Sequence, residues 1–226
     1  FQWEALQNCV VVHIPKNKKS KNFTVFNCST GQPLNDNDLK AQLLTQYIYL
    51  SQEEREAFSN SDYEMLCVCH QRQVTSHQQQ QVRIPLQFNH ALLEMIWFVR
   101  RKCATDTNAH WNFSGIDQKD PIDDATLTLN NQKRWCNQAP YFRIIVPTEV
   151  HSRVPDAYIY VWSWSLNPER WSQPSGSLNA SRIDSIALEL TMQKGLELAP
   201  FTVEVLARSY NVVRFRSGLA GLSYAN

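Results

Sequence analysis

Apolar and polar residues alternate with a period of two through much of this chain, and this pattern limits its fold more than any other feature. Successive side chains of a β-strand point to opposite faces, so the alternation predicts strands with one buried face. The cleanest run spans residues 201–208, where four apolar side chains share one face: Phe201, Val203, Val205 and Ala207. We therefore predict a chain built mainly from β-strands.

The same pattern predicts strands elsewhere in the chain. Residues 82–88 and 93–99 both alternate, and the short break between them indicates two neighbouring strands. In 158–164 aromatic side chains alternate with mostly apolar ones, which indicates a central strand covered on both faces. A short helix is expected at 52–58 with Ser51 as its N-cap. We predict further strands at 43–50, 63–71, 125–130, 141–146, 183–191 and 212–215.

Long links separate these strands and favour one class of β-sandwich. The links 102–124, 147–156 and 167–182 are irregular in sequence. Such links suit a jelly roll, in which strands cross between two sheets, better than a meander of tight hairpins. We predict an all-β, eight-stranded jelly-roll sandwich over residues 41–226, with long loops and little helix.

The first 40 residues differ in character from the rest. A strand-like piece at 9–14 is followed by a lysine-rich stretch at 16–22. This order predicts a strand that belongs elsewhere and then an exposed linker or loop. The chain begins at Phe1 without an initiating methionine, so we expect it to be part of a longer protein.

The charge and hydrophobicity of the chain exclude some classes of partner. A formal net charge of +1 is too small to hold nucleic acid by counterion release. Hydrophobic residues make up 43% of the chain, which is typical of folded domains and not of disordered ones. No apolar run approaches the roughly 20 residues that cross a bilayer. We expect no direct contact with nucleic acid or membrane.

Residues that could carry chemistry are scattered. Cys67 and Cys69 share one face of a predicted strand, but zinc sites normally leave two to four residues between paired cysteines and need further ligands. Ser175 lies outside any nucleophile elbow. We predict no catalytic residue, no metal and no cofactor, and we expect free thiols. The histidines show no paired-ligand spacing: His13, His70, His77, His90, His110 and His151.

Two local patterns concern surface loops. Pro174 and Gly176 suit a chain reversal, since proline fixes one corner and glycine can adopt the positive φ of a type II turn. Four Asn-X-Ser/Thr sequons are weak candidates for glycosylation, because such short patterns arise often by chance. They lie at Asn22, Asn27, Asn112 and Asn179.

The segment 173–184, Gln-Pro-Ser-Gly-Ser-Leu-Asn-Ala-Ser-Arg-Ile-Asp, resembles a signature of the major capsid proteins of nucleocytoplasmic large DNA viruses. Segments 160–168 and 207–226 are similar to the family's preceding strand and its C-terminal end. The resemblance covers about residues 43–226. The residues that carry the signature are Pro174, Ser175, Gly176, Asn179, Ser181, Arg182 and Asp184.

The resemblance implies a function as well as a fold. Members of this family have two jelly rolls in tandem, and three subunits form a pseudo-hexagonal capsomer that tiles an icosahedral shell. By resemblance, this chain is the second roll, and residues 1–40 hold the end of the first roll and the linker. The implied partners are two further copies, neighbouring capsomers and minor capsid proteins. The implied location is the virion capsid, assembled in cytoplasmic virus factories.

The signature residues also predict architecture. Asn179 and Ser181 can fix loop backbone through short side-chain hydrogen bonds. Arg182 and Asp184 would share one face of a strand that begins there and could pair with each other or with a neighbour. We therefore expect this loop to shape subunit contacts and not to catalyse a reaction.

Two alternative functions remain open. One is a minor or penton capsid protein with a single jelly roll. The other is a carbohydrate-binding jelly roll, in which loop aromatics stack on sugar rings; its candidates are Trp111, Trp135 and Trp171. An enzyme of the cupin type would need paired histidines and a following carboxylate, which this sequence lacks.

Overall fold

A computed structural model describes residues 46, 48–107, 109–216 and 219–224, together with three short strands nearer the N-terminus. The chain divides into two units, Phe1–Leu50 and Ser51–Asn226. The first unit contains one antiparallel sheet. Its strands are β1 (Val10–His13), β2 (Thr24–Asn27) and β3 (Pro33–Leu34). β1 confirms the strand predicted at 9–14, whereas the lysine-rich stretch lies outside the described residues.

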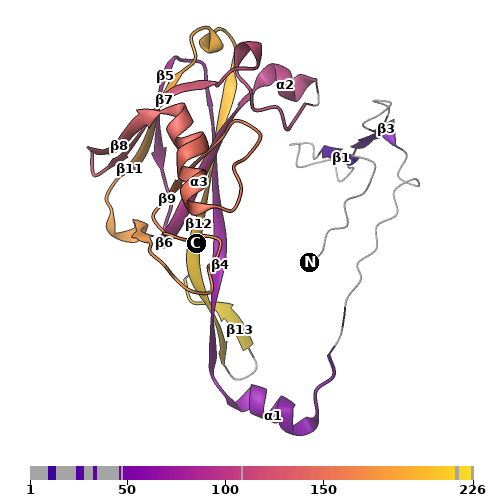
Figure 1. The fold of residues 1–226 in the computed structure, drawn as a ribbon. Helices are drawn as coiled ribbons and strands as arrows, with labels where there is room; N and C mark the ends of the chain where they lie inside the picture. The colour runs from indigo at the N-terminus through magenta and orange to yellow at the C-terminus, as the bar shows by residue number, and fades with distance from the viewer. Residues whose placement is uncertain are drawn as a thin grey trace. The chain divides into compact units, whose positions relative to one another are not determined.

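The second unit contains most of the strands (Figure 1). They are β4 (Tyr63–His77), β5 (Gln81–Leu86), β6 (Ala91–Arg101), β7 (Ile122–Leu129), β8 (Gln132–Gln138), β9 (Ile159–Ser163), β10 (Leu178–Asn179), β11 (Ile186–Met192), β12 (Phe201–Arg216) and β13 (Leu219–Leu222). Its helices are α1 (Gln52–Asn60), α2 (Lys102–Asp106) and α3 (Val146–Val150). Short 3-10 and π turns complete it: η1 (Ile116–Gln118), η2 (Tyr141–Ile145), η3 (Ala180–Arg182) and η4 (Leu196–Leu198).

Eight of these strands form a jelly roll. The first sheet has the order β4-β12-β6-β9, and the second has the order β5-β11-β7-β8. Every pair is antiparallel, and the chain passes repeatedly from one sheet to the other. This crossing pattern is that of a double-sheet jelly roll. The predicted fold class is therefore confirmed.

The core lies between the inner faces of the two sheets. The apolar residues of β12 that alternate from Phe201 to Ala207 are 0–1% exposed, as predicted. Burying such a side chain contributes roughly 1.5–3 kcal/mol. Trp97 packs against Tyr160 and Phe142 with ring centroids 6.0 and 5.3 Å away. The alternation thus reports the core correctly.

Two predictions of strand position were wrong. β5 and β6 are not neighbours, because β5 pairs with β11 in the second sheet and β6 pairs with β12 in the first. β9 is not central: among the described strands it pairs with β6 alone. It is half-buried all the same, because η2 and α3 pack against it. Alternation shows which side chains are buried, but it does not show which strand lies alongside.

Three predicted strand segments also differ in the structure. Residues 141–146 form η2 and the start of α3, because Phe142 and Val146, spaced four apart as on a helix, are the buried pair. Of the strand predicted at 43–50, residues 46 and 48–50 are exposed and lie in no strand, and the rest lies outside the described residues. Residues 212–215 belong to the single long strand β12.

Helix α1 begins as predicted at Ser51. The Ser51 hydroxyl accepts a hydrogen bond from Glu54 N at 3.3 Å, and the Glu54 carboxylate accepts one from Ser51 N at 2.9 Å. This reciprocal capping box satisfies two N–H groups at the start of the helix. All residues of α1 are exposed apart from its C-terminal cap.

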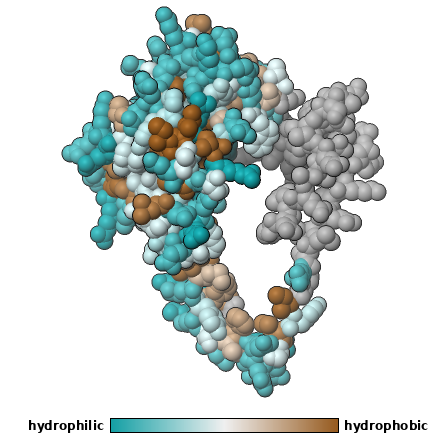
Figure 2. Space-filling model, viewed as in Figure 1, coloured by the Kyte–Doolittle hydropathy of each residue, from teal (hydrophilic) through white to brown (hydrophobic). Residues whose placement is uncertain are grey.

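The visible surface of the second unit is mainly hydrophilic, with several hydrophobic patches (Figure 2). Within the described residues, no helix is both long and apolar enough to span a membrane.

Candidate functional site

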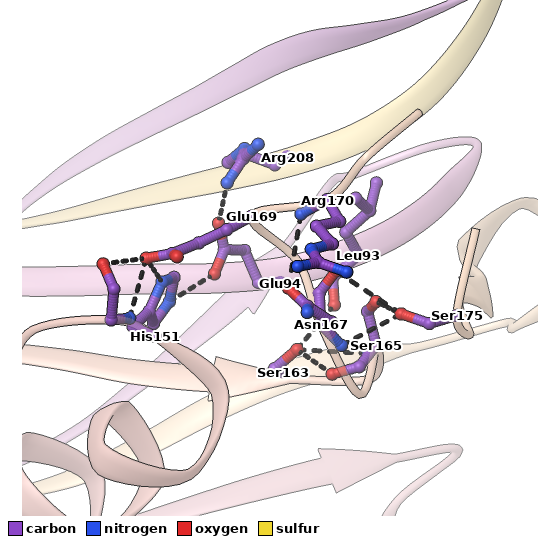
Figure 3. A network of polar contacts seen from close by, with 11 residues as sticks. Leu93, Glu94, His151, Ser163, Ser165, Asn167, Glu169, Arg170, Ser175 and Arg208 are labelled. Atoms are coloured by element: carbon purple, nitrogen blue, oxygen red, sulfur yellow. Dashed lines mark hydrogen bonds and ion pairs between the residues drawn. The ribbon is translucent and has the colours of Figure 1, made fainter. Parts of the chain in front are cut away.

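The candidate site is the long loop between β9 and β11, together with Glu94 of β6 and the charged side chains around it (Figure 3). The loop contains the predicted signature. Its conformation depends on a β-bulge in β6: Arg208 of β12 is opposite Glu94, but Ser209 is opposite Leu92. The extra residue, Leu93, has a carbonyl that accepts hydrogen bonds from Trp164 N at 2.8 Å and from Ser165 N at 3.2 Å. The bulge therefore holds the start of the loop.

Three serines and an asparagine fix the next part of the loop. Ser175 Oγ lies 2.7 Å from Ser165 Oγ and accepts a hydrogen bond from Asn167 N at 2.9 Å. Ser163 Oγ donates to Ser165 O at 2.6 Å. These bonds join the two ends of the 165–175 segment. Ser175 thus holds the loop, as short polar side chains often do.

Gly176 adopts a backbone conformation that suits glycine. Its φ is +137°. A Cβ at this position would lie 2.6 Å from the Trp164 carbonyl oxygen. The positive φ matches the prediction, but residues 174–177 form no turn. Glycine is needed here because the loop passes directly over the Trp164 backbone.

The end of the signature rests on the start of β6. Ser181 Oγ accepts a hydrogen bond from His90 N at 3.0 Å, and Ala180 N donates to His90 O at 2.9 Å. β10 pairs with residues 91–92. Asn179 is exposed and lines a hollow of 490 Å³ with Tyr210 and Tyr224.

The prediction that Arg182 and Asp184 share one face of a strand is wrong. Arg182 ends the 3-10 turn η3, and β11 begins only at Ile186. Both charged side chains are exposed, and neither forms an ion pair with another residue that the structure describes. Pro174 is exposed as well. The structural or interface role of these three residues stays a prediction.

A buried carboxylate lies beneath the loop. Glu94 is fully buried, and its two oxygens contact Arg208 and, at 2.8 Å, His151 Nε2. His151 Nδ1 lies 3.4 Å from Glu169, which also accepts a hydrogen bond from Ser152 N at 2.9 Å. Figure 3 shows His151 between Glu169 and Glu94, with Arg208 on the other carboxylate oxygen. The four side chains connect β6 and β12 with two loops: the loop after α3, which carries His151, and the loop between β9 and β11, which carries Glu169.

The pKa values follow from these contacts. Burial by itself would raise the pKa of Glu94, but the contacts with His151 and Arg208 outweigh it and hold the pKa below its usual value. The Glu94 carboxylate raises the pKa of His151 against the opposing effect of burial. The charged forms of both side chains are therefore favoured in the fold. Sequence reasoning missed this cluster, because its members are far apart in the chain.

We expect the fold to lose stability as the pH rises from about 6 to about 8. The folded pKa of His151 lies above its ordinary value of 6.5. The stability that the charged His151 side chain contributes is therefore complete below pH 6.5 and is lost as the pH rises through the folded pKa. Urea unfolding midpoints at the two pH values measure the effect.

The control for this pH effect is His151→Gln. This variant should lose most of the difference in midpoint between the two pH values. If the variant keeps the full difference, another group is responsible. At acid pH the Glu94 carboxylate has the opposite effect. Because its folded pKa lies below the ordinary carboxyl pKa of 4.5, the stability that it contributes is lost as the pH falls below 4.5.

The other predicted sites are dispersed. Cys67 and Cys69 are half-buried free thiols on one face of β4. Burial raises the pKa of the Cys67 thiol, and the nearby Cys69 side chain raises it further. Cys103 and Cys136 are also free. Among the described residues, no three His, Cys, Asp or Glu side chains gather in a way that could hold a metal ion.

The sequons and loop tryptophans occupy different surroundings. Asn112 uses its side-chain oxygen to accept hydrogen bonds from Ser114 N and Oγ at 3.1 and 2.6 Å. Asn22 lies outside the described residues, as does the side chain of Asn27. Trp111 and Trp171 are 80% and 41% exposed. Trp135 is not in a loop: it lies in β8 and packs on Trp162 with ring centroids 4.4 Å apart.

Comparison with known proteins gives one consistent match. The model of the family described as large eukaryotic DNA virus major capsid protein matches residues 54–221. The major capsid protein of Pyramimonas orientalis virus is 34% identical over 211 residues, which cover 82% of this chain and 49% of that protein. The major capsid protein of Paramecium bursaria Chlorella virus 1 is 28% identical, with coverage of 80% and 53%. The chain thus spans about half the length of these relatives.

Solved structures agree at the level of the fold. The protein in a quasi-atomic model of the PBCV-1 virus capsid matches with a TM-score of 0.63 and 24% identity, over 80% of this chain and 56% of that one. The Faustovirus major capsid protein matches with a TM-score of 0.63 and 13% identity, over 73% and 36%.

Proposed function

Because the chain belongs to the large eukaryotic DNA virus major capsid protein family, we propose that it builds the virus shell by assembling as a homotrimer. Three copies would form a pseudo-hexagonal capsomer, and capsomers would tile an icosahedral capsid beside minor capsid proteins. Its role is structural and not enzymatic. The observation that carries the proposal is the family match over residues 54–221, which spans the whole jelly roll.

The proposal includes a domain assignment. Residues 41–226 are the second of two jelly rolls, and residues 1–40 contain the end of the first roll and the linker. The supporting observation is length: the chain spans about half of its relatives, which leaves room in them for another roll. The same observation favours a major capsid protein over a single-roll minor or penton protein.

The signature loop would shape contacts between subunits. Its backbone is fixed by Ser175, Ser181 and Gly176, while Pro174, Arg182 and Asp184 point outward. A rigid loop with exposed polar side chains loses little conformational entropy when a partner binds. The net charge of +1 offers no field that would hold the genome.

The test is the assembly state of the protein expressed from its complete reading frame. Light scattering after size exclusion should give three times the mass of one subunit, and electron microscopy should show hexagonal capsomers. A protein that remains monomeric at every concentration contradicts the proposal. Binding on a glycan array, lost on replacing Trp111, would instead support the carbohydrate-binding alternative.

A further inference from the structure

Part of the first sheet extends beyond the sandwich. β12 pairs with β4 along nearly its whole length, from Phe201 to Phe215, but β6 covers β12 only as far as Tyr210. Beyond that point β13 pairs with residues 213–216. We call this three-stranded extension, residues 62–67, 211–216 and 219–222, the arm. Figure 1 shows it continuing below the two-sheet body next to α1.

One face of the arm continues the core face of the sheet. The pairing of β12 with β4 has no register shift, so the side that buries Phe201 and Val203 in the body is the side of Val213 and Phe215 in the arm. Two apolar rows cross this face. They are Met65–Val213–Leu222 and Tyr63–Phe215–Ala220. Among the residues that the structure describes, no second sheet packs against this inner face in the arm.

The apolar side chains of this face are exposed. Met65 is 60% exposed, Leu222 53%, Tyr63 41% and Phe215 37%. Phe58 of α1, 55% exposed, extends the face through its ring contact with Tyr63. With about 200 Å² per large side chain, about half of it exposed, the face presents about 500 Å². That is at the upper end for a patch on a monomer, where such patches are often functional.

The opposite face of the arm has different chemistry. Arg214 pairs with Glu64 at 2.7 Å, and Arg216 pairs with Asp62 at 3.1 Å. These charges compensate one another across the strands, so this face does not select a partner of either sign. Of the arm's two faces, the apolar one is the surface that gains most from being covered.

We infer that the apolar face of the arm docks against a second copy of this chain. The inference rests on the proposed function, because in a shell built mainly of one protein most neighbours are copies of that protein. The chain also offers a complementary surface: Ile144 and Ile145 of η2 are 44% and 48% exposed. A contact between two different surfaces of one chain is heterologous and can close into a ring, as a trimer requires.

The apolar area of the arm face is large enough for the centre of an interface but not for a complete one. A stable interface buries about 800 Å² on each partner, and the arm face supplies about 500 Å². The rest must come from polar surface around it. A few well-packed residues at the centre of an interface, often aromatic ones, commonly carry most of the binding energy, so a charge placed among Tyr63, Phe215 and Met65 should weaken association strongly.

The test compares two leucines of the same strand. Leu222→Lys places a charge on the apolar face, and Leu219→Lys places one on the opposite face, where Leu219 is 77% exposed. In the protein from its complete reading frame, Leu222→Lys should weaken self-association at least about tenfold, while Leu219→Lys should leave it unchanged. Circular dichroism should show that both variants keep the wild-type fold.

A photo-cross-linking amino acid at Phe215 identifies the occupant. In a mixture of isotope-labelled and unlabelled copies, cross-links should join one copy to another. Cross-links confined to single copies, or equal assembly of both lysine variants, would overturn the inference and leave the proposed function intact. A wild-type protein that never assembles would contradict both.

Discussion

Replacing Glu94 with alanine is expected to lower the free energy of unfolding by about 3–5 kcal/mol, because it removes the shared partner of two charges. Arg208 and His151 retain only 21% and 16% of their side-chain exposure. Water can therefore replace the lost carboxylate only in part, and His151 and Arg208 lose the side chain that links them on β6. Urea denaturation at about pH 6, where His151 is charged, measures the loss.

The matched control is Glu64→Ala. Glu64 also pairs with an arginine, Arg214, but both side chains are 61% exposed. An exposed pair of this kind contributes only about 0–1 kcal/mol. Similar losses in the two variants would mean that burial does not give the Glu94 cluster its importance. Glu94→Gln should lie between the two variants, because it keeps the shape of the side chain and removes the charge.

Gly176→Ala is expected to cost about 2–4 kcal/mol, the second large effect. The φ of +137° is strained for any residue with a Cβ. The new Cβ would also lie 2.6 Å from the Trp164 carbonyl oxygen, so the loop must move. Thermal unfolding followed by circular dichroism measures the loss of stability.

Gly221→Ala is the control for this substitution. A Cβ at Gly221 meets no atom within 4 Å, and its stability should change by less than about 1 kcal/mol. If Gly176→Ala proves equally mild, the loop is not held rigidly over Trp164, and its proposed role in shaping subunit contacts loses its support.

The helix cap and the buried faces were predictable because they depend on local order. The Ser51 capping box spans three residues. The inner faces of β5 and β12 follow from a period of two, which the backbone imposes whatever lies alongside. The resemblance carried by residues 173–184 is likewise a property of contiguous sequence, and the family match agrees with it.

The errors arose where the outcome depends on distant residues. Residues 141–146 are mostly aromatic and β-branched residues, which favour strands, but packing against β9 and Trp97 selects the helical turn that buries Phe142. β5 and β6 are close in the chain, yet they lie in different sheets. Strand partners depend on how the whole sandwich closes, which no local pattern contains.

The amino-acid sequence alone was enough to predict a β-sandwich of the capsid family, because the periodicity and the signature are both properties of neighbouring residues. The meeting of Glu94, His151, Glu169 and Arg208 and the continuation of the core face of β12 along the arm, where its apolar side chains are exposed, become visible only in the folded chain. Both features depend on strand pairing across 50 residues or more, whose register is fixed by packing and not by any local preference.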